Sequence, residues 1–134
     1  MNAKGQIGFE YLVLTGFLLL IIALVFAYSF VSYSQAIQSQ KAEASLNAIV
    51  GASDYVYGRG NGNTLLVDIE VPEGVSSFQV LDNIVSMRVS GAFGSSDYLR
   101  TSKAAFVPAS LSTSSGPRTL KVEAVDANVR VTGV

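Results

Sequence analysis

The order of apolar and polar residues divides the chain into a helical first half and a β-rich second half. A short polar leader ends at Lys4-Gly5, and an almost purely apolar run extends from Tyr11 to Val31. One acid, Glu10, lies at the start of this run, and no charged side chain occurs between Glu10 and Lys41. About 20 consecutive apolar residues are enough for a helix to cross a bilayer. The pattern therefore predicts a helix of membrane-spanning length near the N-terminus.

We expect the same helix to continue well past the apolar run, because no proline or glycine follows before Gly51. In this second part, apolar residues recur close to the i, i+3, i+4, i+7 spacing of a helix with one buried face. We therefore predict one helix from about Gln6 to Val56, roughly 75 Å long at 1.5 Å per residue. A Gly- and Asn-rich turn over residues 58–63 should end it. The apolar residues of the predicted stripe are Ala42, Leu46, Ile49, Val50 and Tyr57.

From Thr64 onward the pattern changes to the alternation that is typical of β-strands. In the first strand, Val67, Ile69 and Val71 share one face. Residues 110–117 form a serine-rich segment that we interpret as a loop. Short strands joined by turn residues indicate an antiparallel sheet or a small sandwich. Further strands are predicted at residues 76–81, 84–90, 97–100, 104–107, 120–125 and 128–132.

The predicted fold class is therefore α+β, with a long hydrophobic N-terminal helix followed by a small antiparallel β-sheet or β-sandwich domain. The expected organisation has four parts. These are a leader at residues 1–5, the long helix at 6–57, a linker at 58–63 and a β-rich domain at 64–134.

Composition narrows the chemistry that the chain can perform. It has 134 residues, a formal net charge of −1, and neither cysteine nor histidine. Zinc sites of the usual type, thiol catalysis and histidine-dependent triads are therefore excluded. The absence of a basic patch argues against nucleic acid as a partner. We predict that the chain is not an enzyme and binds no cofactor, no metal and no nucleic acid.

The acids of the β-rich half are its candidate chemical groups. Asp68 and Glu70 share one face of a predicted strand, where they could hold a cation or act as an acid pair. A solvated outer face explains the same spacing and is the preferred interpretation. We interpret Glu73, Asp82 and Asp97 as turn acids. The Ser- and Thr-rich residues 112–115 could carry O-linked sugar.

Three interpretations of the N-terminal segment compete. A secretory signal peptide has an apolar stretch of about 7–15 residues and then a small-residue cleavage site, whereas this run is longer and no clear site follows it. A plain signal anchor explains the length but not Glu10, because a charge at the centre of a span costs roughly 2.5–3.5 kcal/mol and less near its end. The third interpretation is a leader that is cut after Gly5, before the apolar run, so that the helix stays on the mature protein.

Cleavage after Gly5 would supply Glu10 with a charged partner. It creates a positive α-amino group on Gln6, which is four residues from Glu10 and therefore shares its helix face. The two groups would be offset by about 6 Å along the axis. The amine of one chain could then pair with Glu10 of a neighbour displaced by a similar step, and this pairing would set the axial register. Lys4, just before the span, favours a cytoplasmic N-terminus.

One stretch resembles the class III signal peptide of archaeal type IV pilin-like proteins, of the euryarchaeal adhesion-pilin type. In that family a membrane aspartic peptidase cuts after the glycine, and a glutamate at the fifth mature position sets the register. The resemblance implies that Lys4, Gly5 and Gln6 form the processing site and that Gln6 and Glu10 set the assembly register. It covers about the first thirty residues, with Gly8 where serine is frequent. The stretch is Lys4-Gly5-Gln6-Ile7-Gly8-Phe9-Glu10-Tyr11-Leu12.

The resemblance implies a type IV pilin-like lollipop fold and a structural role, as a subunit of a surface pilus used in adhesion. Its expected partners are copies of itself in a helical homopolymer, the membrane as precursor, the prepilin peptidase and the pilus assembly machinery. The expected location is the membrane for the N-in precursor and then the extracellular filament. One alternative is an N-anchored membrane protein whose extracytoplasmic β-domain binds a ligand or partner without polymerising. Others are an archaellin, a family that usually lacks this glutamate, and a small extracytoplasmic enzyme.

Overall fold

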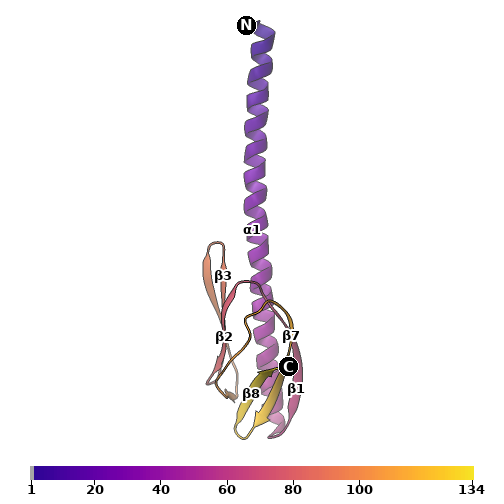
Figure 1. Cartoon of the computed structure of the whole chain (residues 1–134), viewed down its shortest axis with the longest axis vertical. Coiled ribbons are helices and arrows are strands. Elements are labelled where there is room, and N and C mark those ends of the chain that lie inside the picture. Colours follow the sequence, from indigo (N-terminus) through magenta and orange to yellow (C-terminus); the bar gives the residue numbers. More distant parts are fainter. Residues whose placement is uncertain (1) are drawn as a thin grey trace. The chain divides into compact units, whose positions relative to one another are not determined.

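The computed structural model describes residues 2–134, which form two compact units, one ending at Gln35 and one running from Ala36 to Val134. Met1, the first residue of the predicted leader, lies outside the described residues. The described residues contain one long N-terminal helix followed by strands in two sheets (Figure 1), so the predicted α+β class is confirmed. The elements are α1 (Ala3–Arg59), β1 (Thr64–Val71), β2 (Val75–Leu81), β3 (Ile84–Gly91), β4 (Gly94–Thr101), β5 (Ala105–Phe106), β6 (Ala109–Ser110), β7 (Gly116–Val125) and β8 (Asn128–Gly133).

Helix α1 is three residues longer at each end than predicted, and its C-terminal end is closed by the glycine- and asparagine-rich turn. Gly60 and Gly62 adopt φ angles of +97° and +87°, which glycine accepts without a steric penalty. The side-chain amide of Asn63 donates to the carbonyl oxygens of Arg59 and Gly60, at 3.1 and 2.9 Å. These bonds satisfy two carbonyl groups that lie beyond the last helical hydrogen bonds.

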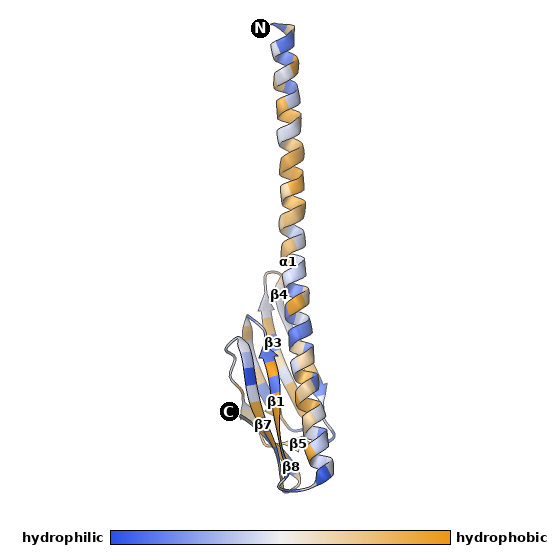
Figure 2. Ribbon diagram, turned by 90° about the vertical axis from the view of Figure 1, so that its right-hand side faces the viewer, coloured by the Kyte–Doolittle hydropathy of each residue, from blue (hydrophilic) through white to orange (hydrophobic). Residues whose placement is uncertain are grey.

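The first unit consists of the N-terminal part of α1, and it is apolar on all sides. From Ile7 to Phe30 every side chain is exposed, although most of them are aliphatic or aromatic. Figure 2 shows this part of the helix coloured largely as hydrophobic. It is long and apolar enough to cross a membrane.

The second unit contains the rest of α1, which buries one stripe of side chains. The predicted stripe is confirmed at Ala42, Leu46 and Ile49, but it is wrong at its end, where Tyr57 is exposed and Val56 is buried instead. Val56 is seven residues after Ile49 and returns to the same face, whereas the next residue lies about 100° further round the helix. Two serines complete the stripe, so the full buried set is Ala42, Ser45, Leu46, Ile49, Ala52, Ser53 and Val56.

The strands form two four-stranded sheets. Sheet A has the order β1-β7-β8-β5, and sheet B has the order β4-β3-β2-β6. The strand predictions hold with shifted ends, except that β6 was not predicted and β7 begins inside the segment interpreted as a loop. The expectation of purely antiparallel pairing is wrong for one pair, since β5 runs parallel to β8. A parallel pair requires a crossover connection, which β6 and β7 supply here.

The core lies between the inner faces of the two sheets and the buried stripe of α1. Its largest fully buried side chains include Phe78 and Met87 from sheet B and Leu46 from the helix. The longer outer strands, β1 and β4, each contact one side of α1 within this unit. Ser45 and Gln38 of α1 bond to the β1 side, and Asn47 and Ser39 bond to β4. Backbone groups of Glu70 and Glu73 are therefore paired with the helix, whereas the bonds to β4 join side chains only.

Candidate functional site

The predicted processing residues Lys4, Gly5 and Gln6 lie in the first turns of α1, and all three are exposed. The amides of Gly5 and Gln6 donate to the carbonyl oxygen of Asn2, at 2.8 and 3.3 Å. The first turn contains no acid, and Lys4 places a positive charge at the positive end of the helix dipole. The first turn therefore lacks the favourable interaction that an acid would make with this end of the helix.

Glu10 lies on the same exposed face of α1 as Gln6, one turn further on. Val13, Leu14 and Phe17 follow it at the i+3, i+4 and i+7 positions and line a shallow groove with it. No hydrogen bond or ion pair joins the Glu10 carboxylate to another of residues 2–134. The structure thus brings together the two predicted register residues on one face, with the carboxylate at the head of an apolar groove.

The exposed apolar surface of the first unit is far larger than the patches of a few hundred Å² that monomeric soluble proteins show. A surface of this kind is typical of segments that contact lipid or other proteins. Its large members include Ile7, Phe9, Leu12, Phe17, Leu18, Leu19, Leu20, Leu24, Val25 and Phe26.

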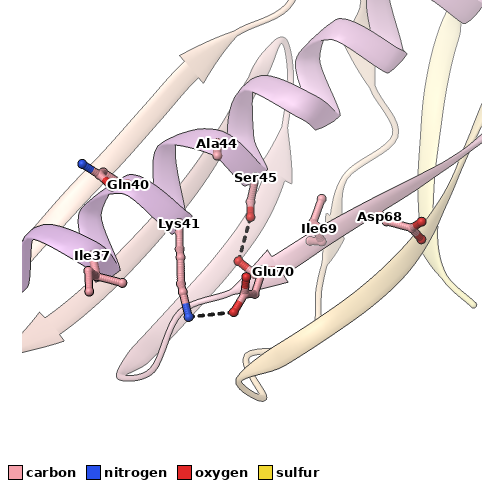
Figure 3. Close-up of a pocket in the computed structure, with 8 residues that line it drawn as sticks. All are labelled: Ile37, Gln40, Lys41, Ala44, Ser45, Asp68, Ile69 and Glu70. Carbon is pink, nitrogen blue, oxygen red and sulfur yellow. Dashed lines mark hydrogen bonds and ion pairs between the residues drawn. The ribbon is translucent and has the colours of Figure 1, made fainter. Parts of the chain in front are cut away.

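A groove in the second unit, between α1 and β1, brings together the acids of the first strand with a lysine (Figure 3). The Lys41 ammonium lies 2.6 Å from a carboxylate oxygen of Glu70, and the Ser45 hydroxyl donates to the Glu70 carbonyl oxygen at 2.8 Å. Asp68 points away from this pair and accepts a hydrogen bond from Thr119 at 2.7 Å. The two acids therefore have separate partners and do not converge, as expected of an outer strand face.

The other acids of the second unit have structural partners. Asp82 adopts a φ of +52° in the turn between β2 and β3, and Glu73 lies in the turn after β1, so both are turn acids as predicted. Asp97 was interpreted wrongly, because it lies within β4 opposite Arg88. The Arg88 guanidinium donates to both carboxylate oxygens of Asp97, at 2.6 and 2.9 Å. Their hydrogen bonds lower the pKa of Asp97 and raise the pKa of Arg88.

The structural roles of two charged residues were not predicted from the sequence. Asp54 on α1 accepts hydrogen bonds from the Ser102 hydroxyl and the Lys103 amide, at 2.7 and 2.9 Å. Arg118 on β7 lies directly opposite Ile69 and therefore on the core face of sheet A. The alternation Arg118, Leu120, Val122, Ala124 could have revealed that position, because every second residue of a strand shares a face.

Among residues 2–134, no group of three or more acids is arranged to hold a metal ion. The serine-rich residues 112–115 are exposed, and O-linked sugar on them stays a prediction. No protein-family model, curated protein or solved structure matches this chain. A functional site must therefore be inferred from the residues of this chain alone. The strongest candidate is the exposed apolar surface of the first unit together with Glu10.

Proposed function

We propose that this chain is a structural subunit of an archaeal type IV-like pilus. It is cut between Gly5 and Gln6 and polymerises through its N-terminal helix, and the filament serves in surface adhesion. The observation that carries the proposal is the position of Glu10. It is an acid without a partner among the described residues, one turn after Gln6, at the start of an exposed apolar helix.

The charge arrangement supports processing before assembly. With the leader attached, Lys4 lies at the positive end of the helix dipole, which is unfavourable. Cleavage removes Lys4, places a positive amine on Gln6 and brings Glu10 close to the new helix start. The amine of one copy then neutralises Glu10 of an axially displaced copy, which removes the cost of leaving that carboxylate among apolar side chains.

The apolar surface supports exchange between the membrane and a helix bundle. Burial of a Leu, Ile, Val or Phe side chain contributes roughly 1.5–3 kcal/mol relative to water. Lipid and a bundle of neighbouring helices both provide that burial, so the transfer between them is close to balanced. Side-chain packing, pairing through Glu10 and the assembly machinery supply the net drive. A contact of this head-to-tail kind repeats without closing and gives an open helical filament.

Paired glutamate variants test the proposal. Glu10→Gln keeps the size of the side chain but removes the charge, so we expect normal membrane levels of the precursor and at least about a tenfold loss of surface filaments. Glu73→Gln, on an exposed turn of the second unit, is the matched control and should assemble normally. Normal filaments from Glu10→Gln would remove the register role. Absence of filaments from the unmodified chain would favour the alternative of an N-anchored protein that does not polymerise.

A further inference from the structure

A cavity of about 240 Å³ opens between the two sheets of the second unit. Ile69, Phe78, Leu120 and Val131 are all buried and form its apolar floor. No residue of α1 lines it. The cavity is slightly smaller than the roughly 300–1,000 Å³ of pockets that bind drug-sized ligands, so it suits a compound with a single ring or a short aliphatic chain.

One cation stands at the mouth of this cavity. Arg118 is paired across the sheet with Ile69, so both side chains project from the core face of sheet A. The Arg118 side chain is exposed and, within residues 2–134, takes part in no hydrogen bond or ion pair, as is also true of Arg130 on the outer face of β8.

Protection of a sheet edge does not explain this arginine. Inward-pointing charges commonly block outer strands from pairing with other chains. However, β7 is an inner strand that is paired with β1 on one side and β8 on the other, so it presents no free edge. A free guanidinium above an apolar floor instead combines the two features that bind an amphipathic anion. Its fork of donors matches the two oxygens of a carboxylate or phosphate.

We propose that this cavity is a binding site for a small amphipathic anion. The apolar body of the ligand contacts Phe78 and Leu120, and its carboxylate or phosphate accepts hydrogen bonds from Arg118. This site is separate from the assembly helix, so it does not rest on the proposed pilus function.

A titration of the full chain in phospholipid nanodiscs with para-fluorobenzoate, followed by fluorine NMR, tests the site. We expect saturable binding above the background of empty nanodiscs. Arg118→Gln should weaken binding about tenfold or more, because it removes charge-assisted hydrogen bonds. Arg118→Lys, which retains the charge but not the fork, should lose less affinity. The uncharged analogue para-fluorobenzamide should bind the unmodified chain about tenfold more weakly than the acid.

Two further variants separate the site from non-specific attraction. Arg130→Gln removes the same charge from the outer face of β8 and should leave the affinity unchanged. Ala109→Leu adds volume at the cavity wall and should abolish binding while the circular dichroism spectrum stays the same. Absence of saturable binding, or equal affinity in the unmodified chain and Arg118→Gln, would overturn the proposal.

Discussion

Ser45 of α1 donates its hydroxyl to the carbonyl oxygen of Glu70 on β1 across 2.8 Å, and Ser45 is only 3% exposed. β1 is an outer strand, and at this one carbonyl a helix side chain supplies the hydrogen bond. Ser45→Ala should lower the free energy of unfolding by about 1–3 kcal/mol, because it leaves that carbonyl oxygen without its partner. Thermal unfolding of the full chain in detergent micelles, followed by circular dichroism, measures this change.

Ser53→Ala is the matched control for this prediction. Ser53 is equally buried, but its hydroxyl donates to the carbonyl oxygen of Ile49 in the same helix, at 2.7 Å. That oxygen keeps its backbone hydrogen bond when the hydroxyl is removed, and alanine is the better helix former. We expect a change within about 0.5 kcal/mol. Equal losses in the two variants would contradict the role given to Ser45.

Gly74 is the glycine whose replacement should be most damaging. Its φ is +79°, and a β-carbon there would collide with the carbonyl oxygen of Ser90. Gly62 has a similar φ of +87°, but no heavy atom lies within 4 Å of the position that a β-carbon would occupy there. Gly62→Ala should therefore lower the free energy of unfolding by only about 1–2 kcal/mol, because a residue with a β-carbon disfavours a positive φ. Gly74→Ala adds the steric collision and should lower it by more than about 3 kcal/mol. Similar melting temperatures for the two variants would refute the steric explanation.

The buried stripe of α1 contributes to the stability of the core of the second unit. Leu46 is fully buried against the sheets, whereas Leu66 on the outer face of β1 is 62% exposed. Leu46→Ala should lower the free energy of unfolding by about 2–5 kcal/mol. Leu66→Ala should change it by no more than about 0.5 kcal/mol. If denaturant unfolding shows comparable effects, α1 does not pack as described.

Asp97 should titrate below the usual pKa of its residue type, because Arg88 donates to both of its carboxylate oxygens. The folded pKa is lower than the unfolded one, so the pair stabilises the fold above the unfolded pKa of about 3.9 and loses this contribution as the pH falls. NMR titration should show the pKa of Asp97 rising in Arg88→Gln and unchanged in Arg130→Gln. The same pKa in all three proteins would exclude the pair as the cause.

The sequence predicted the parts of this fold that depend on local periodicity. The long helix and most strands follow from patterns of spacing 3.6 and 2, and Asp82 in its turn follows from turn chemistry. The strand pair β5 and β8 could not be foreseen, because two-residue strands carry no period and parallel pairing is decided by tertiary contacts. The same limit hid β6, which pairs with β2 over only two residues.

Charged residues were predicted less well than apolar ones, because their environment depends on segments that are distant in sequence. Asp97 was predicted to be a turn residue, but the structure places it in β4, opposite Arg88 of β3. Arg118 looks like a loop residue beside Pro117, yet the register with β1 sets it on the core face. Lys4, Gly5, Gln6 and Glu10 form a local motif, so their predicted roles come from the sequence alone.

The central claim is that the mature chain begins at Gln6 and builds a filament. The most direct measurement is mass spectrometry of the N-terminal peptide from surface filaments sheared off native cells. The account predicts filaments made of this chain, with a first residue of Gln6 and no peptide that contains Lys4. A chain that retains Met1 and is found in the membrane but not in the filaments would contradict it.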